Sequence, residues 1–186
     1  MKRSTISLVV VYLSWLLSAC SGSTALNQSY NDEGVPTWVN KGSKILRTKD
    51  NRLFHGVGSA PMMGDYSMQT DIANRRARQE MARIIASYME IVSRDYIATG
   101  KAAPTGFNEL DVMKYIDELS KMDLAKVKVV GHWSDEKSNK IYAITQMDMN
   151  KVRKVISKLI SMDEGLKAYL EKNGGNVFDR IATVEE

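Results

Sequence analysis

MQTDIANRRARQEMARIIASYMEIVSRDYIA, residues 68–98, carries the longest helical pattern of the chain, because its apolar residues recur at steps of three and four. On a helix this spacing forms a single apolar stripe, which other elements have to cover. The sequence therefore predicts a helix over residues 68–98 with one face in a core. The stripe consists of Ile72, Ala73, Ala77, Met81, Ile84, Ile85, Tyr88, Ile91 and Val92.

The same segment carries a cluster of arginines, Arg75, Arg76, Arg78 and Arg83. Acidic residues lie four positions away from two of them, a spacing at which opposite charges stabilise a helix. We expect the arginines to form a solvated face that adds little to the stability of the fold. The alternative is that they bind an anionic partner, such as a lipid headgroup or a glycan polymer.

A predicted strand, residues 53–59, precedes this helix and overlaps the small-residue run GVGSA at residues 56–60. Glycines after a strand can bind a dinucleotide phosphate when a helix follows at once. Pro61 stands where the third glycine of that motif belongs, and the next helix starts about ten residues later, so this interpretation is rejected. The glycines instead predict close packing against the helix, with Ala73 and Ala77 at the contact.

Further elements follow the long helix. Asn108 is the expected N-cap of a helix that ends near residue 122. Residues 127–133 and 141–147 are expected to form two strands joined by a polar turn. Asp148 or Asn150 can cap a further helix.

The C-terminal residues 163–186 are less regular than the rest of the chain. We expect a short helix through Lys172, a break at Gly174-Gly175 and a final, weakly amphipathic stretch. Phe178 and Ile181 lie three residues apart on one face of that stretch. They are expected either to pack on the core of their own domain or to insert into a neighbouring molecule.

This order of elements predicts an α+β fold: a small antiparallel sheet of about three strands, packed against a long helix and further helices, with a helical C-terminal tail. The predicted domain covers residues 36–162 and opens with the rigid turn PTWV at residues 36–39, and the tail covers residues 163–186. A turn signal at residues 50–51 lies between two apolar pairs. So small a sheet leaves edges that can pair with another chain.

The start of the chain has the pattern of a cleaved export signal. Lys2 and Arg3 precede the apolar residues 6–17, and LSAC at residues 17–20 places small side chains before Cys20. As a helix, residues 6–17 would span about 18 Å of the roughly 30 Å of hydrocarbon in a bilayer, so cleavage is favoured over a permanent span. We expect residues 1–19 to be removed and Cys20 to be acylated. The alternative is an ordinary secretory signal with an incidental cysteine.

Acyl chains on Cys20 would hold the protein firmly at a membrane. The residue after the cysteine is Ser21 rather than aspartate, which by resemblance to lipoprotein sorting rules favours the outer membrane. Residues 20–35 read as a flexible, lipidated tether. Loss of Lys2 and Arg3 lowers the formal charge from +4 to +2, so nucleic acid is not an expected partner.

The sequence offers little for catalysis or metal binding. The candidate imidazoles are His55 and His132, and the chain's single cysteine, Cys20, is expected to carry lipid. No nucleophile, base and orienting group converge in the pattern, so we expect no enzymatic site, no cofactor and no metal. Methionines crowd the loop before the long helix, at Met62 and Met63; they can fill gaps in the core or form an adaptable contact surface.

With the LSAC motif, the PTWV opening, the GVGSA run and the helix ANRRARQEMA at residues 73–82, the chain resembles the Lpp-twenty-like outer-membrane lipoproteins of bacteria over residues 36–159. The resemblance implies a non-enzymatic lipoprotein that self-assembles in the periplasm. Its flagellum-associated branch implies a ring or disk around the motor that motility requires, with motor or peptidoglycan-associated proteins as partners.

We therefore expect a structural homo-oligomer on the outer membrane, facing the periplasm. The alternative is a periplasmic binding module that docks on an envelope enzyme or on peptidoglycan. The candidate interaction residues are Met62, Met63, Arg75, Arg76, Arg78, Arg83, Phe178 and Ile181.

Overall fold

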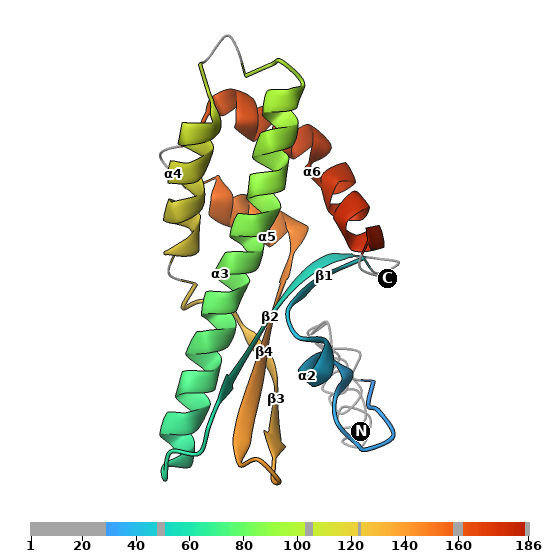
Figure 1. Cartoon of the computed structure of the whole chain (residues 1–186), viewed down its shortest axis with the longest axis vertical. Helices are drawn as coiled ribbons and strands as arrows, with labels where there is room; N and C mark the ends of the chain where they lie inside the picture. Colours follow the sequence, from blue (N-terminus) through green and yellow to red (C-terminus); the bar gives the residue numbers. More distant parts are fainter. Residues whose placement is uncertain (1–28, 48–50, 103–105, 123, 158–161, 185–186) are drawn as a thin grey trace, which may run out of the picture.

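The computed structural model describes residues 29–47, 51–102, 106–122, 124–157 and 162–184. They form an α+β fold in which a four-stranded antiparallel sheet packs against a long helix and further helices (Figure 1). The order of the strands in the sheet is β1-β2-β4-β3. The elements are α2 (Thr37–Lys41), β1 (Lys44–Arg47), β2 (Arg52–Ala60), α3 (Tyr66–Ala98), α4 (Glu109–Ser120), β3 (Val129–Asp135), β4 (Lys140–Asp148), α5 (Met149–Ile156) and α6 (Glu164–Val184).

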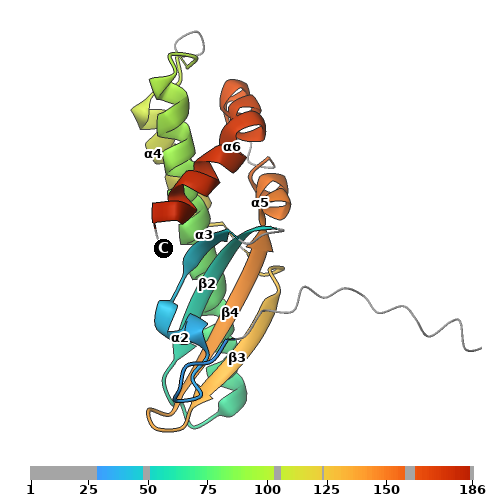
Figure 2. The same cartoon turned by 90° about the vertical axis from the view of Figure 1, so that its right-hand side faces the viewer.

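Helix α3 runs along the whole molecule and gives it an elongated shape (Figure 1). The first half of α3 covers one face of the sheet, and the second half extends beyond the sheet between α4 and α6. The short helix α2 lies on the opposite face of the sheet (Figure 2). The molecule therefore has a sheet end and a helical end, and α3 is common to both.

Helices α3, α4 and α5 begin at residues whose side chains accept hydrogen bonds from free backbone N–H groups. Asp65 accepts from Met68 N at 3.0 Å and so starts α3 two residues earlier than residue 68. Asn108 is the N-cap of α4, as predicted, and forms a capping box with Asp111, while Asp148 caps α5. The predicted helix over residues 68–98 and its end at Ala98 are therefore confirmed, with a correction at the start.

Small residues allow α3 to lie directly on the sheet, as the sequence predicts. A Cβ atom on Gly56 would lie 2.6 Å from Met81 N, and one on Gly58 would lie 2.6 Å from the carbonyl carbon of Arg76. Ala73 and Ala77 are fully buried at this contact. The hydroxyl of Thr145, on β4, donates to the Gly56 and Ala77 carbonyls at 3.1 and 3.2 Å. The GVGSA run thus lies in a strand that packs against the side of α3. Helix α3 does not begin directly after this run, so the run does not form the phosphate-binding turn that was rejected above.

The core of the helical end is built around aromatic rings. Phe54 of β2 packs edge-on against Tyr88 of α3 and Phe178 of α6, with ring centroids 5.3 and 5.1 Å apart. The Tyr88 hydroxyl donates to the Gly174 carbonyl at 2.8 Å. Edge-to-face pairs of this kind add stability beyond the area that they bury. Helix α6 therefore shares one core with β2 and α3.

The break expected at Gly174-Gly175 is wrong, since α6 is continuous from Glu164 to Val184. A Cβ atom on Gly174 would lie 2.7 Å from the Tyr88 hydroxyl, and one on Gly175 would lie 3.0 Å from the Arg52 guanidinium. These glycines serve close packing inside a helix rather than its termination. That packing outweighs the poor helix propensity of glycine, which costs about 1 kcal/mol per residue.

The structure contains two elements that were not predicted from the sequence, strand β1 and helix α2. Strand β1 adds a fourth strand to the expected three, pairing Ile45 with Phe54 across the predicted turn at residues 50–51, which lies partly outside the described residues. The expected rigid turn at residues 36–39 is instead the start of α2, whose Trp38 is buried.

The last part of the expected flexible tether is folded. Asn31 accepts from Glu33 N and Val35 N at 3.1 and 2.8 Å, and Tyr30 pairs with Pro36 in an isolated bridge. Residues 29–35 therefore form a turn that is bonded to the start of α2 through Ser29 and Thr37, instead of being extended. Among the described residues, no helix combines the length and the apolar character needed to cross a bilayer.

Candidate functional site

The loop between β2 and α3 (residues 61–65) and the turn between β3 and β4 (residues 136–139) lie together at the free end of the sheet, which we call the tip (Figure 1). Met62 and Met63, which the sequence singled out, are exposed there, Met62 by 67%. Tyr66, at the start of α3, is 68% exposed and was missed in the sequence because it precedes the periodic stripe. The tip thus presents large apolar side chains to solvent.

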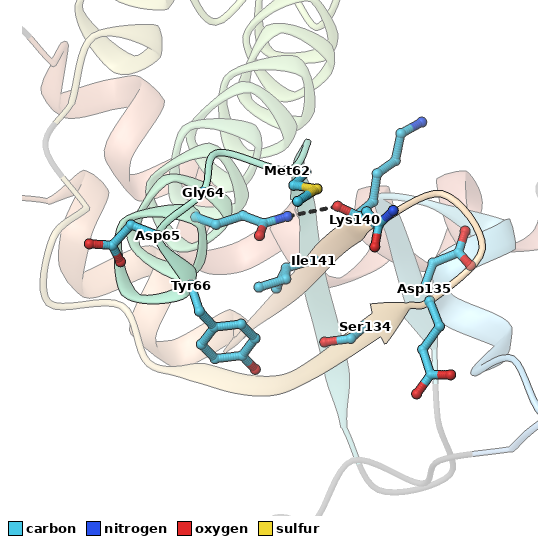
Figure 3. Close-up of a pocket in the computed structure, with 11 residues that line it drawn as sticks. Met62, Gly64, Asp65, Tyr66, Ser134, Asp135, Lys140 and Ile141 are labelled. Carbon is cyan, nitrogen blue, oxygen red and sulfur yellow. Dashed lines mark hydrogen bonds between the residues drawn. The ribbon is translucent and has the colours of Figure 1, made fainter.

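A shallow cavity of about 290 Å³ lies between these two segments. Figure 3 shows Ile141, which is buried, between Met62 and Tyr66, with Ser134 and Asp135 on the opposite side and the Asp65 carboxylate pointing away. Methionine and tyrosine combine apolar surface with conformational or polar adaptability. The cavity can therefore receive an apolar side chain of a partner.

The backbone of the tip is held in place by a buried amide. Gln69 Nε2 donates to the Ala60 carbonyl at 3.1 Å and to the Asn139 carbonyl at 2.9 Å, so it links β2 to the β3–β4 turn. Asp135 accepts from the Ser138 hydroxyl and from Lys137 N. These bonds, that to Ser138 first, lower the pKa of the Asp135 carboxyl. The exposed side chains of the tip are therefore attached to a backbone that these hydrogen bonds hold in place.

The arginines of α3 do not form one uniform face. Arg75 is exposed, and Arg83 pairs with Glu80 at 2.9 Å. Arg76 instead donates to the Ser59 carbonyl of β2 at 2.7 Å, and Arg78 donates to the Val127 carbonyl, in the connection before β3, at 3.0 Å. A solvated face is therefore an accurate description of Arg75 and Arg83, whereas Arg76 and Arg78 also join α3 to the segments beside it.

The two C-terminal candidates, Phe178 and Ile181, pack on their own domain. Phe178 is fully buried in the main core, and Ile181 is partly buried against it. The sequence left open whether these residues pack on their own core or insert into a neighbouring molecule, and in the structure they pack on their own core. The prediction that Phe178 belongs to an interaction surface is wrong, because its ring is covered by Phe54 and Tyr88.

The two histidines occupy different environments. His55 is buried on β2, with Nε2 3.2 Å from Gln146 Oε1. Burial lowers the pKa of His55, and the hydrogen bond to Gln146 opposes this effect. His132 is exposed, with Nε2 2.6 Å from Asn74 Oδ1. In the hydrogen bonds of the described residues, the partners of the two imidazoles are the side-chain amide oxygens of Gln146 and Asn74.

Within the described ranges, no group of three or more His, Cys, Asp and Glu side chains is placed to hold a metal ion. The expectations for the leader and for lipidation of Cys20 fall on residues 1–28, which lie outside the described part of the chain.

Sequence reasoning missed a second cavity, of about 680 Å³, where the chain passes from α4 to β3 beside α5. It is surrounded by Lys126, Lys128, Lys151 and Lys154. In the sequence, residues 127–133 predict a strand, and the lysines at its start give no sign of a cavity. The i, i+3 spacing of Lys151 and Lys154 could have indicated a basic helix face.

Comparison with protein-family models and with curated proteins finds no match to this chain.

Proposed function

We propose that this protein is a non-enzymatic structural lipoprotein of the outer membrane, anchored through acyl chains on Cys20, with its folded domain in the periplasm. The observation that carries the proposal is the start of the chain: Lys2 and Arg3, then an apolar stretch, then LSAC at residues 17–20. A cysteine behind small residues in this context is a lipidation site rather than a disulfide partner.

The proposed role of the domain is self-association. Strand β3 lies at one edge of the sheet, where backbone groups are open to a further strand. The tip beside it presents Met62, Met63 and Tyr66. Confinement of anchored copies to a membrane raises their effective concentration, so weak contacts at these surfaces are enough for assembly. A flagellum-associated ring or disk is the assembly that the family resemblance favours.

The anchor is tested by feeding cells radiolabelled palmitate. Wild-type protein is expected to take up label, and Cys20→Ser is expected to take up none and to remain an uncleaved precursor. Equal labelling of the two would remove the anchor from the proposal.

Assembly is tested on the detergent-solubilised full chain by sedimentation at several protein concentrations. The wild type is expected to sediment as an oligomer, and the pair Met62→Glu and Tyr66→Glu is expected to shift it toward monomer. Leu110→Glu with Met113→Glu is the matched control, because these side chains on α4 are also exposed. A monomer at every concentration, also on a lipid surface, would favour the periplasmic binding module instead. Loss of motility with intact filaments on deletion would support the flagellar assignment.

A further inference from the structure

The larger cavity exists because the sheet opens at one corner. Strand β3 pairs with β4 up to Val129 opposite Thr145, with a register shift at its start. Beyond Thr145, β4 continues through Gln146 and Met147, which pair with β2 on their other side. Among the described residues the chain before Val129 turns away, with Val127 N bonded to the Leu124 carbonyl at 2.8 Å. The edge of β4 is left facing a cavity of about 680 Å³.

The walls of this cavity are apolar. Leu124, Val127 and Met147 are buried, and Met122 and Val155 are half-buried beside them. Arg78 holds the near wall by its hydrogen bond to the Val127 carbonyl. The described lining side chains are aliphatic, thioether, amide and ammonium groups, none of which stacks as an aromatic ring does on a base or a sugar ring. The shape and lining instead fit a flexible hydrocarbon chain.

The rim is cationic. Lys126 and Lys128 come from the connection before β3, and Lys151 and Lys154 from α5. Lys151 pairs with Asp148 at 3.0 Å, whereas Lys126, Lys128 and Lys154 form no ion pair within the described residues. Among the residues that the structure describes, no acidic side chain lines the cavity. The four ammonium groups attract an anion to the mouth of the cavity. The apolar walls disfavour a charged group deeper in the cavity, because burying an unpaired charge is costly.

We propose that this cavity binds a single-chain anionic amphiphile, with its acyl chain against Met147 and Val155 and its acid group among the lysines. The volume lies within the roughly 300–1,000 Å³ typical of small-molecule sites. The carboxylate of a free fatty acid and the phosphate of a lysophospholipid share this chemistry. The inference does not rest on the anchor or on assembly, so it can fail or hold independently of both.

The test uses the full chain purified in a zwitterionic detergent, with photoreactive laurate as the probe. Cross-links are mapped by mass spectrometry, so general contact with detergent micelles is separated from the site. Cross-links are expected at residues 122–128 and 146–155. Unlabelled laurate is expected to compete, octanoate to compete less by about fourfold per missing methylene, and dodecanol and dodecyltrimethylammonium to compete weakly.

The decisive variant carries Lys126→Gln, Lys128→Gln and Lys154→Gln, and site labelling is expected to fall about tenfold, since each rim contact is of modest strength. The matched control carries Lys114→Gln, Lys137→Gln and Lys140→Gln, which removes the same charge elsewhere and should leave labelling unchanged. Val155→Phe keeps the lysines and fills the cavity, and it should also lower labelling. Circular dichroism checks that each variant is folded.

Equal labelling of the two lysine triples, or competition by dodecanol as effective as that by laurate, would overturn the proposal. If the lysine variant does not fold, the competition series on wild-type protein and Val155→Phe still decide it. A photoreactive lysophosphatidate distinguishes the two sources of the acid group: stronger labelling than laurate assigns a phospholipid, and weaker labelling assigns a free fatty acid.

Discussion

At the contact between β2 and α3, the absence of a Cβ atom on two glycines of β2 allows the strand and the helix to pack directly against each other. Gly56 and Gly58 have no room for a Cβ, because the backbone of Ala77 and its neighbours occupies that space. Ala77 is itself fully buried. A side chain larger than a methyl group at this position would force helix and sheet apart, since protein interiors are packed without spare volume.

Ala77→Leu is therefore expected to lower the free energy of unfolding by about 1–3 kcal/mol through overpacking. The matched control is Ala98→Leu, at an exposed position near the end of the same helix, which should change stability by less than about 0.5 kcal/mol. Urea denaturation followed by circular dichroism measures both. Equal midpoints for Ala77→Leu and wild type would mean that this face of α3 is not in the core.

His55 is the second residue where environment dominates. Its ring is buried between strands, and its Nδ1 atom has no hydrogen-bond partner within the described residues. Burial holds the pKa of His55 below its ordinary value, against the effect of Gln146. The folded protein therefore keeps the imidazole neutral at a pH where the unfolded chain has begun to bind a proton.

The consequence is a pH dependence of stability. Because the unfolded state binds more protons in this window, stability is complete above the ordinary histidine pKa of about 6.5 and falls as pH decreases toward the lower folded pKa. Between the two values the loss is about 1.4 kcal/mol per pH unit. His55→Gln should remove this contribution, and His132→Gln should retain it. Stability curves between pH 7 and pH 5 that coincide for wild type and His55→Gln would contradict the prediction.

Helix α6 illustrates the scale of a whole element. Its Val177 and Phe178 are buried, and Asp179 accepts two hydrogen bonds from the Arg52 guanidinium, at 2.7 and 2.8 Å. The hydrogen bond to Asp179 raises the pKa of Arg52. Burial of the guanidinium lowers this pKa, but by less. Because the side chains of this pair remain partly exposed to solvent, the pair adds little to stability, and the buried apolar residues supply most of the stability of α6.

Truncation after Asn173 is accordingly expected to destabilise the domain rather than only its assembly. Removing a buried phenylalanine alone costs about 3–5 kcal/mol, and the truncation also removes Val177. Asn176→Ala, at an exposed position of the same segment, should be neutral within about 0.5 kcal/mol. Thermal melting of the three proteins is the measurement. A truncated chain that melts with the wild type would place α6 outside the core.

At the scale of the whole molecule, two core clusters share helix α3 and strand β2. The smaller cluster, at the sheet end, consists of small and aliphatic side chains around Ala73 and Ala77. The larger one, at the helical end, contains the rings of Phe54, Tyr88 and Phe178. Helix α3 and strand β2 run through both, so neither end can unfold without breaking elements of the other.

This continuity predicts one cooperative unfolding transition. Fluorescence of Trp38 and Trp133 reports on the sheet end, and far-ultraviolet circular dichroism reports mainly on the helices. The two signals are expected to change at the same urea concentration and with the same slope, as in two-state unfolding. Separate midpoints would show that the helical end and the sheet end are independent units.

Part of the candidate surface could be predicted from sequence and part could not. Met62 and Met63 stood out because methionines crowd a short loop, and they are exposed. Phe178 stood out on a weak amphipathic stretch, but the pattern alone could not say whether its own core or a neighbour covers it. The lysine-rimmed cavity could not be predicted, because it joins residues of a connection, a strand edge and a helix that only the fold brings together.

The sequence by itself determined the α+β class, the long helix, the cap at Asn108 and the close contact of Gly56 and Gly58 with α3, because these depend on periodicity, local hydrogen bonds and side-chain size. Only the tertiary structure decided that β1 pairs with β2 and that α6 passes through Gly174-Gly175 without a break. The physical reason is the same in both cases. Local propensity opposes or barely favours these elements, and contacts with residues distant in the chain, such as Tyr88, stabilise them.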